Sequence, residues 1–235
     1  FIFFRNHLSW PRTIKIQLAR SFFLFLSTIL FFYSISIISL TETLTLAFVS
    51  PIVVTLLSAI LLKEKVGKRR WIAVIVGFIG ALVVLRPGFN TISLASLAGV
   101  GTGICYAFYV ITTRKLSSID GPFLTLIFTG LTGAIIISLI VPFVWITPNF
   151  NQLLIMIALA AIGTLGHFLL ILSLNFAEAS KLAPFAYFEI VTNILIAYYF
   201  FGDFPDKWIW IGLIIIVASG VYITIREHLL EKVKT

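Results

Sequence analysis

The chain has 235 residues, of which 60% are hydrophobic and 11% charged, and its mean hydropathy is +1.11. Soluble domains carry about 25% charged residues, so this chain has too few charges to cover a surface in contact with water. This composition excludes a soluble globular protein. The apolar residues come in long runs, whereas the strands of a membrane barrel alternate, so the sequence predicts an all-α membrane protein.

The long apolar runs predict eight membrane-spanning helices in chain order. Each run is close to the ~20 residues that a helix needs to cross a bilayer. Pro51 lies inside the second run and predicts a bend there, because proline removes one helical hydrogen bond. The expected spans cover residues 16–40, 43–62, 71–85, 92–113, 122–145, 152–176, 182–201 and 208–225.

The basic residues predict the orientation of these spans. If the connection before the first span is cytoplasmic, every Lys and Arg except Arg86 and Lys207 lies on the cytoplasmic side. Such a distribution follows the positive-inside rule and predicts a multi-pass inner-membrane protein with a cytoplasmic C-terminus. The net charge of +8 is then a consequence of topology, so no nucleic-acid partner is expected. The partners are the lipid bilayer and a small-molecule substrate, and a homodimer is left open.

An internal repeat relates spans one to three to spans six to eight. At one constant separation, Glu64 matches Asp203, and further matches are Ser34 with Ser173, Lys68 with Lys207 and Trp71 with Trp210. Each span is matched with the fifth span after it along the chain. Successive spans cross the membrane in alternating directions, so an odd shift gives the two copies opposite orientations. Inverted repeats are typical of secondary transporters, with the substrate site near the midplane.

The stretch LAFVSPIVVTLLSAILLKEKVGKRRWIAVIVGFIGALVVLRPG, residues 46–88, resembles the EamA family of the drug/metabolite transporter superfamily. The residues that carry the resemblance are the mid-helix Pro51, the acidic Glu64 after that helix, and Gly77 and Gly80 in the next. The second half looks like the same module with Asp203 at the acidic position, although Ile190 replaces the proline. The stretches APFAYFEI and FFGDFPD are similar to a subgroup that includes S-adenosylmethionine uptake transporters.

The resemblance implies ten helices in two inverted five-helix repeats, of which eight are present and the first repeat is incomplete. Residues 1–87 are expected to form the first repeat with three full helices, 92–226 the second repeat with five, and 227–235 a cytoplasmic tail. Phe1–Phe4 is expected to be the end of a second, missing helix. The family also implies carriage of a small metabolite without ATP hydrolysis.

Glu189 is the strongest candidate for a binding residue, because a carboxylate at membrane depth costs about 2.5–3.5 kcal/mol on insertion scales. Asn193 follows four residues later and lies on the same helix face. One interpretation is a cavity carboxylate that binds a cationic or zwitterionic substrate or carries a coupling proton. The alternative is a carboxyl group that only bonds a neighbouring helix.

Other polar and aromatic residues of the spans extend this candidate site. His167 could pair with Glu189 across a cavity, or act only as a structural hydrogen-bonding group. Hydroxyls orient a substrate and rings stack on planar groups or cations, although serines and threonines often bond their own helix backbone. The further candidates are Tyr33, Ser50, Pro51, Tyr106 and Tyr187. No metal or other cofactor is expected, because three His and one Cys show no ligand spacing.

The sequence therefore predicts a secondary transporter that works by alternating access. The substrate class is expected to be amino acids or other small nitrogenous metabolites, with S-adenosylmethionine as a specific possibility. A truncated, non-transporting membrane or assembly protein is the main alternative. A membrane-embedded enzyme using His167 and Glu189 is disfavoured, because the midplane is nearly empty of ionisable residues.

Overall fold

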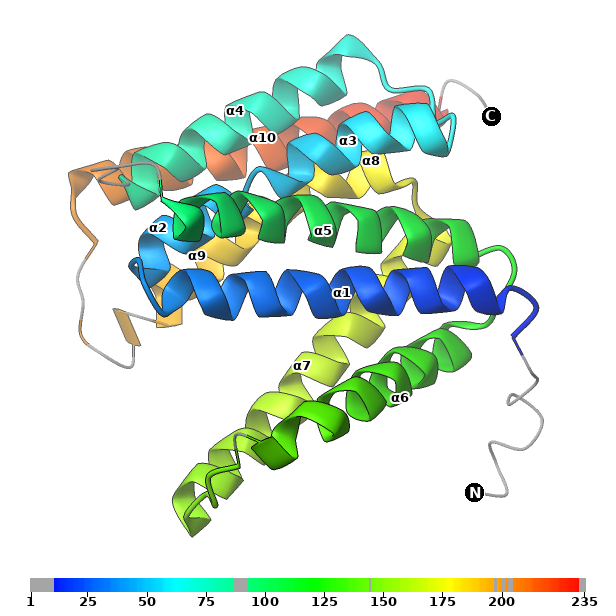
Figure 1. Cartoon of the computed structure of the whole chain (residues 1–235). Coiled ribbons are helices and arrows are strands. Elements are labelled where there is room, and N and C mark those ends of the chain that lie inside the picture. The colour runs from blue at the N-terminus through cyan, green and yellow to red at the C-terminus, as the bar shows by residue number, and fades with distance from the viewer. Residues whose placement is uncertain are drawn as a thin grey trace. The chain divides into compact units, whose positions relative to one another are not determined.

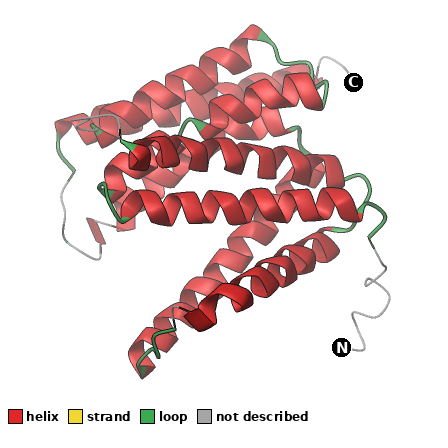
Figure 2. Ribbon diagram, in the orientation of Figure 1, coloured by secondary structure: helices red, strands yellow, loops and turns green. Residues whose placement is uncertain are grey.

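The computed structural model describes residues 11–86, 93–143, 145–196, 198–199, 202 and 205–232, without the side chains of 224 and 227–232. Every regular element in these ranges is helical (Figure 2). The chain divides into two compact units. The first comprises Phe1–Phe25 and Thr112–Ala177, and the second comprises Leu26–Ile111 and Glu178–Thr235. The division falls within helix α1 (Ile14–Ile35) and within helix α5 (Leu94–Leu116).

The first unit contains α6 (Pro122–Ile140), the short 3-10 helix η2 (Val141–Phe143) and α7 (Phe150–Phe176), with the ends of α1 and α5 that belong to it. Proline in the first turn starts α6, where the missing N–H costs no hydrogen bond. A capping box between Asn149 and Gln152 starts α7. Helices α6 and α7 pack together, and the rings of Phe123 and Phe168 meet edge to face at 6.0 Å.

A buried polar network ties α1 to α5 and α6 in this unit. The amide of Gln17 donates to Asp120 Oδ2 at 2.9 Å, and Arg20 Nε donates to Thr113 Oγ1 at 2.7 Å. Arg20 also bonds Thr129, and both Gln17 and Arg20 are fully buried. Arg20, one of the basic residues expected on the cytoplasmic side, lies within α1, which begins at Ile14 and carries this guanidinium into the packed unit.

The second unit contains α2 (Leu40–Ala47), α3 (Ser50–Leu61), α4 (Lys68–Leu85), α8 (Ala179–Leu182), the 3-10 helix η3 (Ala183–Tyr187), α9 (Phe188–Ile196) and α10 (Lys207–Lys232). Helices α4 and α10 lie side by side along much of their length (Figure 1). Their contact includes a hydrogen bond of 2.7 Å from Ser219 Oγ to the carbonyl of Ala73. The apolar core of the unit comprises Phe48, Ala81, Val84, Tyr187, Ile190 and Ile216.

All eight predicted spans coincide with helical segments, so the all-α membrane class is confirmed. By length and composition, five segments of the described chain can cross a membrane, at 14–35, 40–61, 94–116, 122–143 and 150–176. Two spans expected to be continuous are broken. The span at 43–62 divides into α2 and α3, and that at 182–201 begins as α8 and η3 before α9. Residues 197, 200 and 201 of the latter lie outside the described residues.

Candidate functional site: a cavity between broken helices

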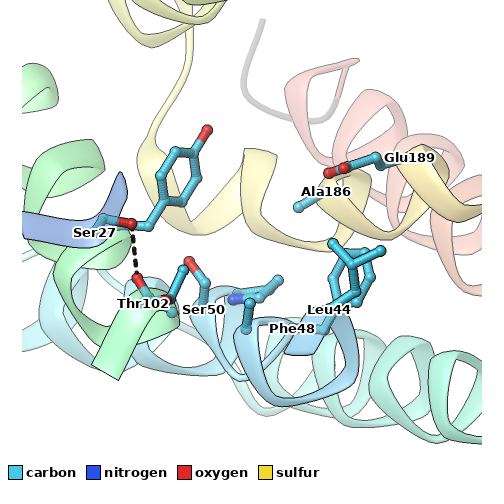
Figure 3. A pocket seen from close by; sticks show the side chains of 11 residues that line it. Ser27, Leu44, Phe48, Ser50, Thr102, Ala186 and Glu189 are labelled. Atoms are coloured by element: carbon cyan, nitrogen blue, oxygen red, sulfur yellow. Dashed lines mark hydrogen bonds between the residues drawn. The ribbon is translucent and has the colours of Figure 1, made fainter. Parts of the chain in front are cut away.

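A cavity of about 290 Å³ lies within the second unit, beside both broken helices. Five segments form its wall: α1, α2 with the turn after it, α3, α5, and the η3–α9 segment. Figure 3 shows Glu189 facing this space from the wall opposite Leu44, Phe48 and Ser50. The lining residues are Ser27, Leu44, Ala47, Phe48, Ser50, Pro51, Thr102, Gly103, Tyr106, Ala186 and Glu189.

Pro51 is the physical reason for the break between α2 and α3. Because proline has no N–H, the carbonyl of Ala47 receives no helical hydrogen bond from position 51. The N–H of Ile52 bonds the carbonyl of Val49 at 3.1 Å, so a new helix begins rather than the old one continuing. The bend predicted at Pro51 is therefore an interruption of the helix, and it places Ala47, Phe48 and Ser50 on the cavity wall.

The second break lies immediately before Glu189. Pro184 sits in the first turn of η3, whose 3-10 geometry continues to Tyr187, and α9 then begins at Phe188. Glu189 thus occupies the first turn of α9, where the positive end of the helix dipole stabilises a carboxylate by about 0.3–1 kcal/mol. The two broken helices bring Ser50 and Glu189 to the same cavity.

Small residues let α5 approach the α2–α3 break closely. A Cβ atom at Gly103 would lie 2.5 Å from the carbonyl oxygen of Ala47, so only glycine fits there. Ser27 of α1 donates a hydrogen bond of 3.0 Å to the carbonyl of Thr102, which lies on α5 next to Gly103. These contacts hold α1, α5 and the break around one space.

The charge of the cavity wall is one-sided. Glu189 is the only carboxylate among the lining residues, and none of the lining residues in the described part of the chain is Lys, Arg or His. Its side chain is exposed rather than sealed in the core, so a ligand can reach it from the cavity. Phe48 and Tyr106 add two aromatic rings to the wall. Such a wall favours a ligand with a positive charge and an apolar or planar part.

The structure brings four predicted site residues together and places the other four elsewhere. Glu189, Ser50, Pro51 and Tyr106 line the cavity, whereas Asn193, one turn beyond Glu189, is exposed and does not. Tyr33 is 43% exposed on α1, also away from the cavity. Tyr187 is fully buried in the apolar core, where its hydroxyl donates to the carbonyl of Phe48 at 3.5 Å. His167 lies half-buried on α7 in the first unit, so its pairing with Glu189 stays a prediction.

Sequence reasoning missed several lining residues, among them Ser27, Thr102 and Phe48. Ser27 and Thr102 carry a weak signal, as small polar residues inside apolar spans, but many other residues share it. Among the described residues, no group of three or more His, Cys, Asp or Glu is arranged to hold a metal ion.

A polar cluster joins α3 to α8 at the end where Glu64 lies. Lys63, with a left-handed φ of 56°, follows Leu62, the residue that caps the end of α3. The Glu64 carboxylate accepts bonds from the N–H groups of Ala179 and Ser180 at 3.0 Å each and from Ser180 Oγ at 2.7 Å. Arg70 donates to Glu178 at 2.6 Å and to Ser180 Oγ at 2.9 Å. The Glu64 carboxylate thus bonds the start of α8.

An exposed ion pair joins the C-terminal end of α4 to the start of α10. Arg86 lies 2.5 Å from Asp206, and the two side chains are 47% and 46% exposed. Asp206 also accepts bonds of 2.9 Å from the N–H groups of Trp208 and Ile209, which begin α10. These bonds and the Arg86 charge hold the pKa of Asp206 below its ordinary value, with the Ile209 N–H the largest contribution. Asp203, the expected counterpart of Glu64, lies outside the described residues.

These features define a polytopic helical membrane protein with a ligand cavity between broken helices, the architecture of a carrier. The model of the EamA-like transporter family matches residues 1–86 and 93–225, and the chain belongs to this family. It is therefore a membrane transporter of small metabolites rather than an enzyme.

Two curated relatives illustrate the similarity. The chain is 27% identical over 212 residues to an S-adenosylmethionine uptake transporter of Rickettsia bellii (strain RML369-C), covering 90% of this chain and 73% of that protein. It is 32% identical over 191 residues to a riboflavin transporter of Vibrio cholerae serotype O1, covering 78% of this chain and 62% of that protein. The fold is also similar to that of a crystal structure, with a TM-score of 0.76 and 17% sequence identity. The match covers 92% of this chain and 79% of the chain in that crystal structure, and it shows the fold alone.

Proposed function

We propose that this protein is a secondary carrier of a small nitrogenous metabolite with a positively charged group, either a cation or a zwitterion, across the inner membrane, and that the cavity beside Glu189 is its substrate site. Amino acids and S-adenosylmethionine are the substrate classes considered. The observation that carries this proposal is that, among the described residues that line the cavity, Glu189 has the only charged side chain.

The charge on Glu189 favours a cation over a neutral ligand of the same size. A carboxylate and a cation 4 Å apart interact by about 4 kcal/mol at an effective dielectric constant of 20. None of the described lining residues is basic, so no charge among them cancels this attraction. Among the relatives, an S-adenosylmethionine transporter handles a cation, which supports the same reading. Riboflavin, which the Vibrio cholerae relative carries, has no positive charge for Glu189 to bind.

Contacts within the second unit support the inverted repeat at 1–87 and 92–226. Phe48 and Tyr187 are 139 residues apart, the separation that relates the two copies, and their rings lie 5.9 Å apart. Two equivalent residues meet in this way near a two-fold axis. The same separation relates Ala73 to Gly212 and Ser219 to Gly80, so the counterpart of the Ala73–Ser219 hydrogen bond is a contact between Gly212 and Gly80. These two glycines do lie in contact, since a Cβ atom at Gly212 would lie 2.8 Å from the Gly80 carbonyl oxygen.

Alternating access requires that contacts at the two ends of the cavity open in turn. With the C-terminal tail, 227–235, in the cytoplasm, the Glu64 cluster lies at the cytoplasmic end and the Arg86–Asp206 pair at the outer end. Among the described residues, the cytoplasmic cluster has more hydrogen bonds than the outer pair, and it joins α3 to α8, the elements that lead to the two cavity walls. We propose that this cluster closes the cavity on the cytoplasmic side. The homodimer left open by the sequence stays a prediction.

Uptake by the complete protein in cells or proteoliposomes tests the proposal, with labelled S-adenosylmethionine, lysine and riboflavin as probes. Glu189→Gln is expected to reduce cation uptake at least tenfold, because it removes the charge without changing the shape of the side chain. Glu42→Gln is the matched control, because Glu42 lies on α2 and does not line the cavity. Unchanged cation uptake by a folded Glu189→Gln protein would overturn the proposed substrate site.

A further inference from the structure

Ser50 differs from Ser27 and Thr102, the other serine and threonine residues that line the cavity. Ser27 and Thr102 each donate their hydroxyl hydrogen to a backbone carbonyl at 3.0 Å. The hydroxyl of Ser50 has no hydrogen-bond partner among the described residues, although Ser50 is only 8% exposed. Figure 3 shows this side chain on the cavity wall, so the remaining open side of the hydroxyl faces the cavity.

The position of Ser50 in its helix determines which ligand group suits it. Ser50 is the first residue of α3, a helix of 12 residues whose preceding residue, Val49, supplies no side-chain cap. The N-terminus of a helix carries a partial positive charge, which favours a negatively charged group next to it. The Ser50 hydroxyl has no hydrogen-bond partner among the described residues, so an acceptor on a ligand in the cavity can accept its hydrogen. A carboxylate oxygen satisfies both requirements.

The opposite wall provides the complementary charge. Glu189 lies in the first turn of α9, and its position matches that of Ser50 in the repeat. At equivalent positions of the two repeats, the cavity therefore has a hydrogen-bond donor on α3, which favours a negatively charged ligand group, and a carboxylate on α9, which favours a positively charged one. A ligand that satisfies both has an ammonium group and a carboxylate.

We infer that Ser50 forms a second subsite of this cavity, which binds the carboxylate of an α-amino acid head group while Glu189 binds its ammonium group. The substrate class is then free amino acids or metabolites that retain an intact α-amino acid end, with the remainder of the molecule against Phe48 and Tyr106. This inference rests on the proposed function, because it assigns a substrate class to the same cavity.

The test is equilibrium binding to the whole protein in lipid nanodiscs with a matched pair of ligands. S-adenosylmethionine carries the amino acid head group, and its decarboxylated form keeps the positive charges but lacks the carboxylate. Ser50→Ala is expected to weaken binding of S-adenosylmethionine about tenfold or more, since a hydrogen bond to a charged group is lost. Binding of the decarboxylated ligand is expected to stay unchanged. Ser50→Thr, which retains the hydroxyl, is expected to keep most of the affinity for both.

The outcomes separate the two proposals. If Ser50→Ala binds both ligands as the unchanged protein does, or loses affinity for both equally, the Ser50 subsite is wrong. Glu189→Gln should still weaken both ligands in that case, and the proposed cation site stands. If Glu189→Gln weakens neither ligand, or if the unchanged protein binds neither, both proposals are wrong. Thermal melting of each variant in the same nanodiscs verifies that the fold is retained.

Discussion

Gly212 on α10 lies directly against Gly80 on α4. A Cβ atom at Gly212 would lie 2.8 Å from the carbonyl oxygen of Gly80 and 3.0 Å from the backbone nitrogen of Val84. Both of these atoms belong to the backbone, so a side chain at position 212 could fit only if the helices moved apart. The close packing of α4 and α10, which supports the cavity from behind, depends on the absence of a side chain at this position.

Replacement of Gly212 by valine is expected to separate α4 from α10. Overpacking of this kind costs about 1–3 kcal/mol, so the melting temperature of the detergent-solubilised protein should fall. Gly166→Val is the matched control, because nothing lies within 4 Å of a Cβ atom at Gly166 on α7. Its effect should stay within about 0.5 kcal/mol. Equal melting temperatures for the two variants would contradict the packing described for α4 and α10.

Removal of the charge on Glu64 is expected to loosen the contact between α3 and α8. A carboxylate that accepts three hydrogen bonds loses strength as an acceptor when it becomes an amide, and each such bond contributes about 1.5–3 kcal/mol to the pairing. A cysteine at Ala186, on the cavity wall, reports access in a Cys105→Ala protein. Glu64→Gln should raise the rate at which a membrane-impermeant maleimide applied from the cytoplasmic side modifies this cysteine.

Glu42→Gln again serves as the control for this measurement, since Glu42 lies on α2, away from the Glu64 cluster. The labelling rate of the control should equal that of the protein with an unchanged Glu64. The proposed cytoplasmic closure is incorrect if Glu64→Gln labels at the control rate while the protein remains folded.

Asp206 is expected to make stability depend on pH in the acidic range. The N–H group of Ile209, the Arg86 side chain and the N–H group of Trp208 depress its pKa in the folded protein. A depressed pKa means that the carboxylate stabilises the fold at pH values above its ordinary pKa, and that this contribution is lost as the pH falls through the depressed value. Asp206→Asn should therefore melt earlier than the unchanged protein at neutral pH.

The difference in melting temperature between these two proteins should shrink as the pH is lowered below the ordinary pKa of an aspartate. Arg86→Gln should reproduce part of the effect, because it removes one of the groups that depress the pKa. A difference that is constant from neutral to strongly acidic pH would show that Asp206 acts without its charge.

The cavity was only partly predictable from the sequence. Glu189 and Pro51 are conspicuous because a carboxylate and a proline are both unfavourable inside an apolar helix, so each requires a local explanation. Ser27 and Thr102 are not conspicuous, because the same residue types also bond their own helix elsewhere in this chain, as Ser21 does with Gln17. Tyr187 was expected at the site but packs in the core, because its ring fills the space that Gly77 leaves on α4.

By itself, the sequence determined the membrane class, the helical spans and an irregularity at Pro51, which it predicted as a bend. These properties follow from the free energy of moving a short run of residues into lipid and from the missing N–H of proline, and both are local. Only the tertiary structure decided which faces of the helices meet, the burial of Arg20, the partners of Glu64 and the free hydroxyl of Ser50. Lipid and protein core are both apolar, so hydrophobicity cannot distinguish a face that contacts lipid from one that contacts another helix.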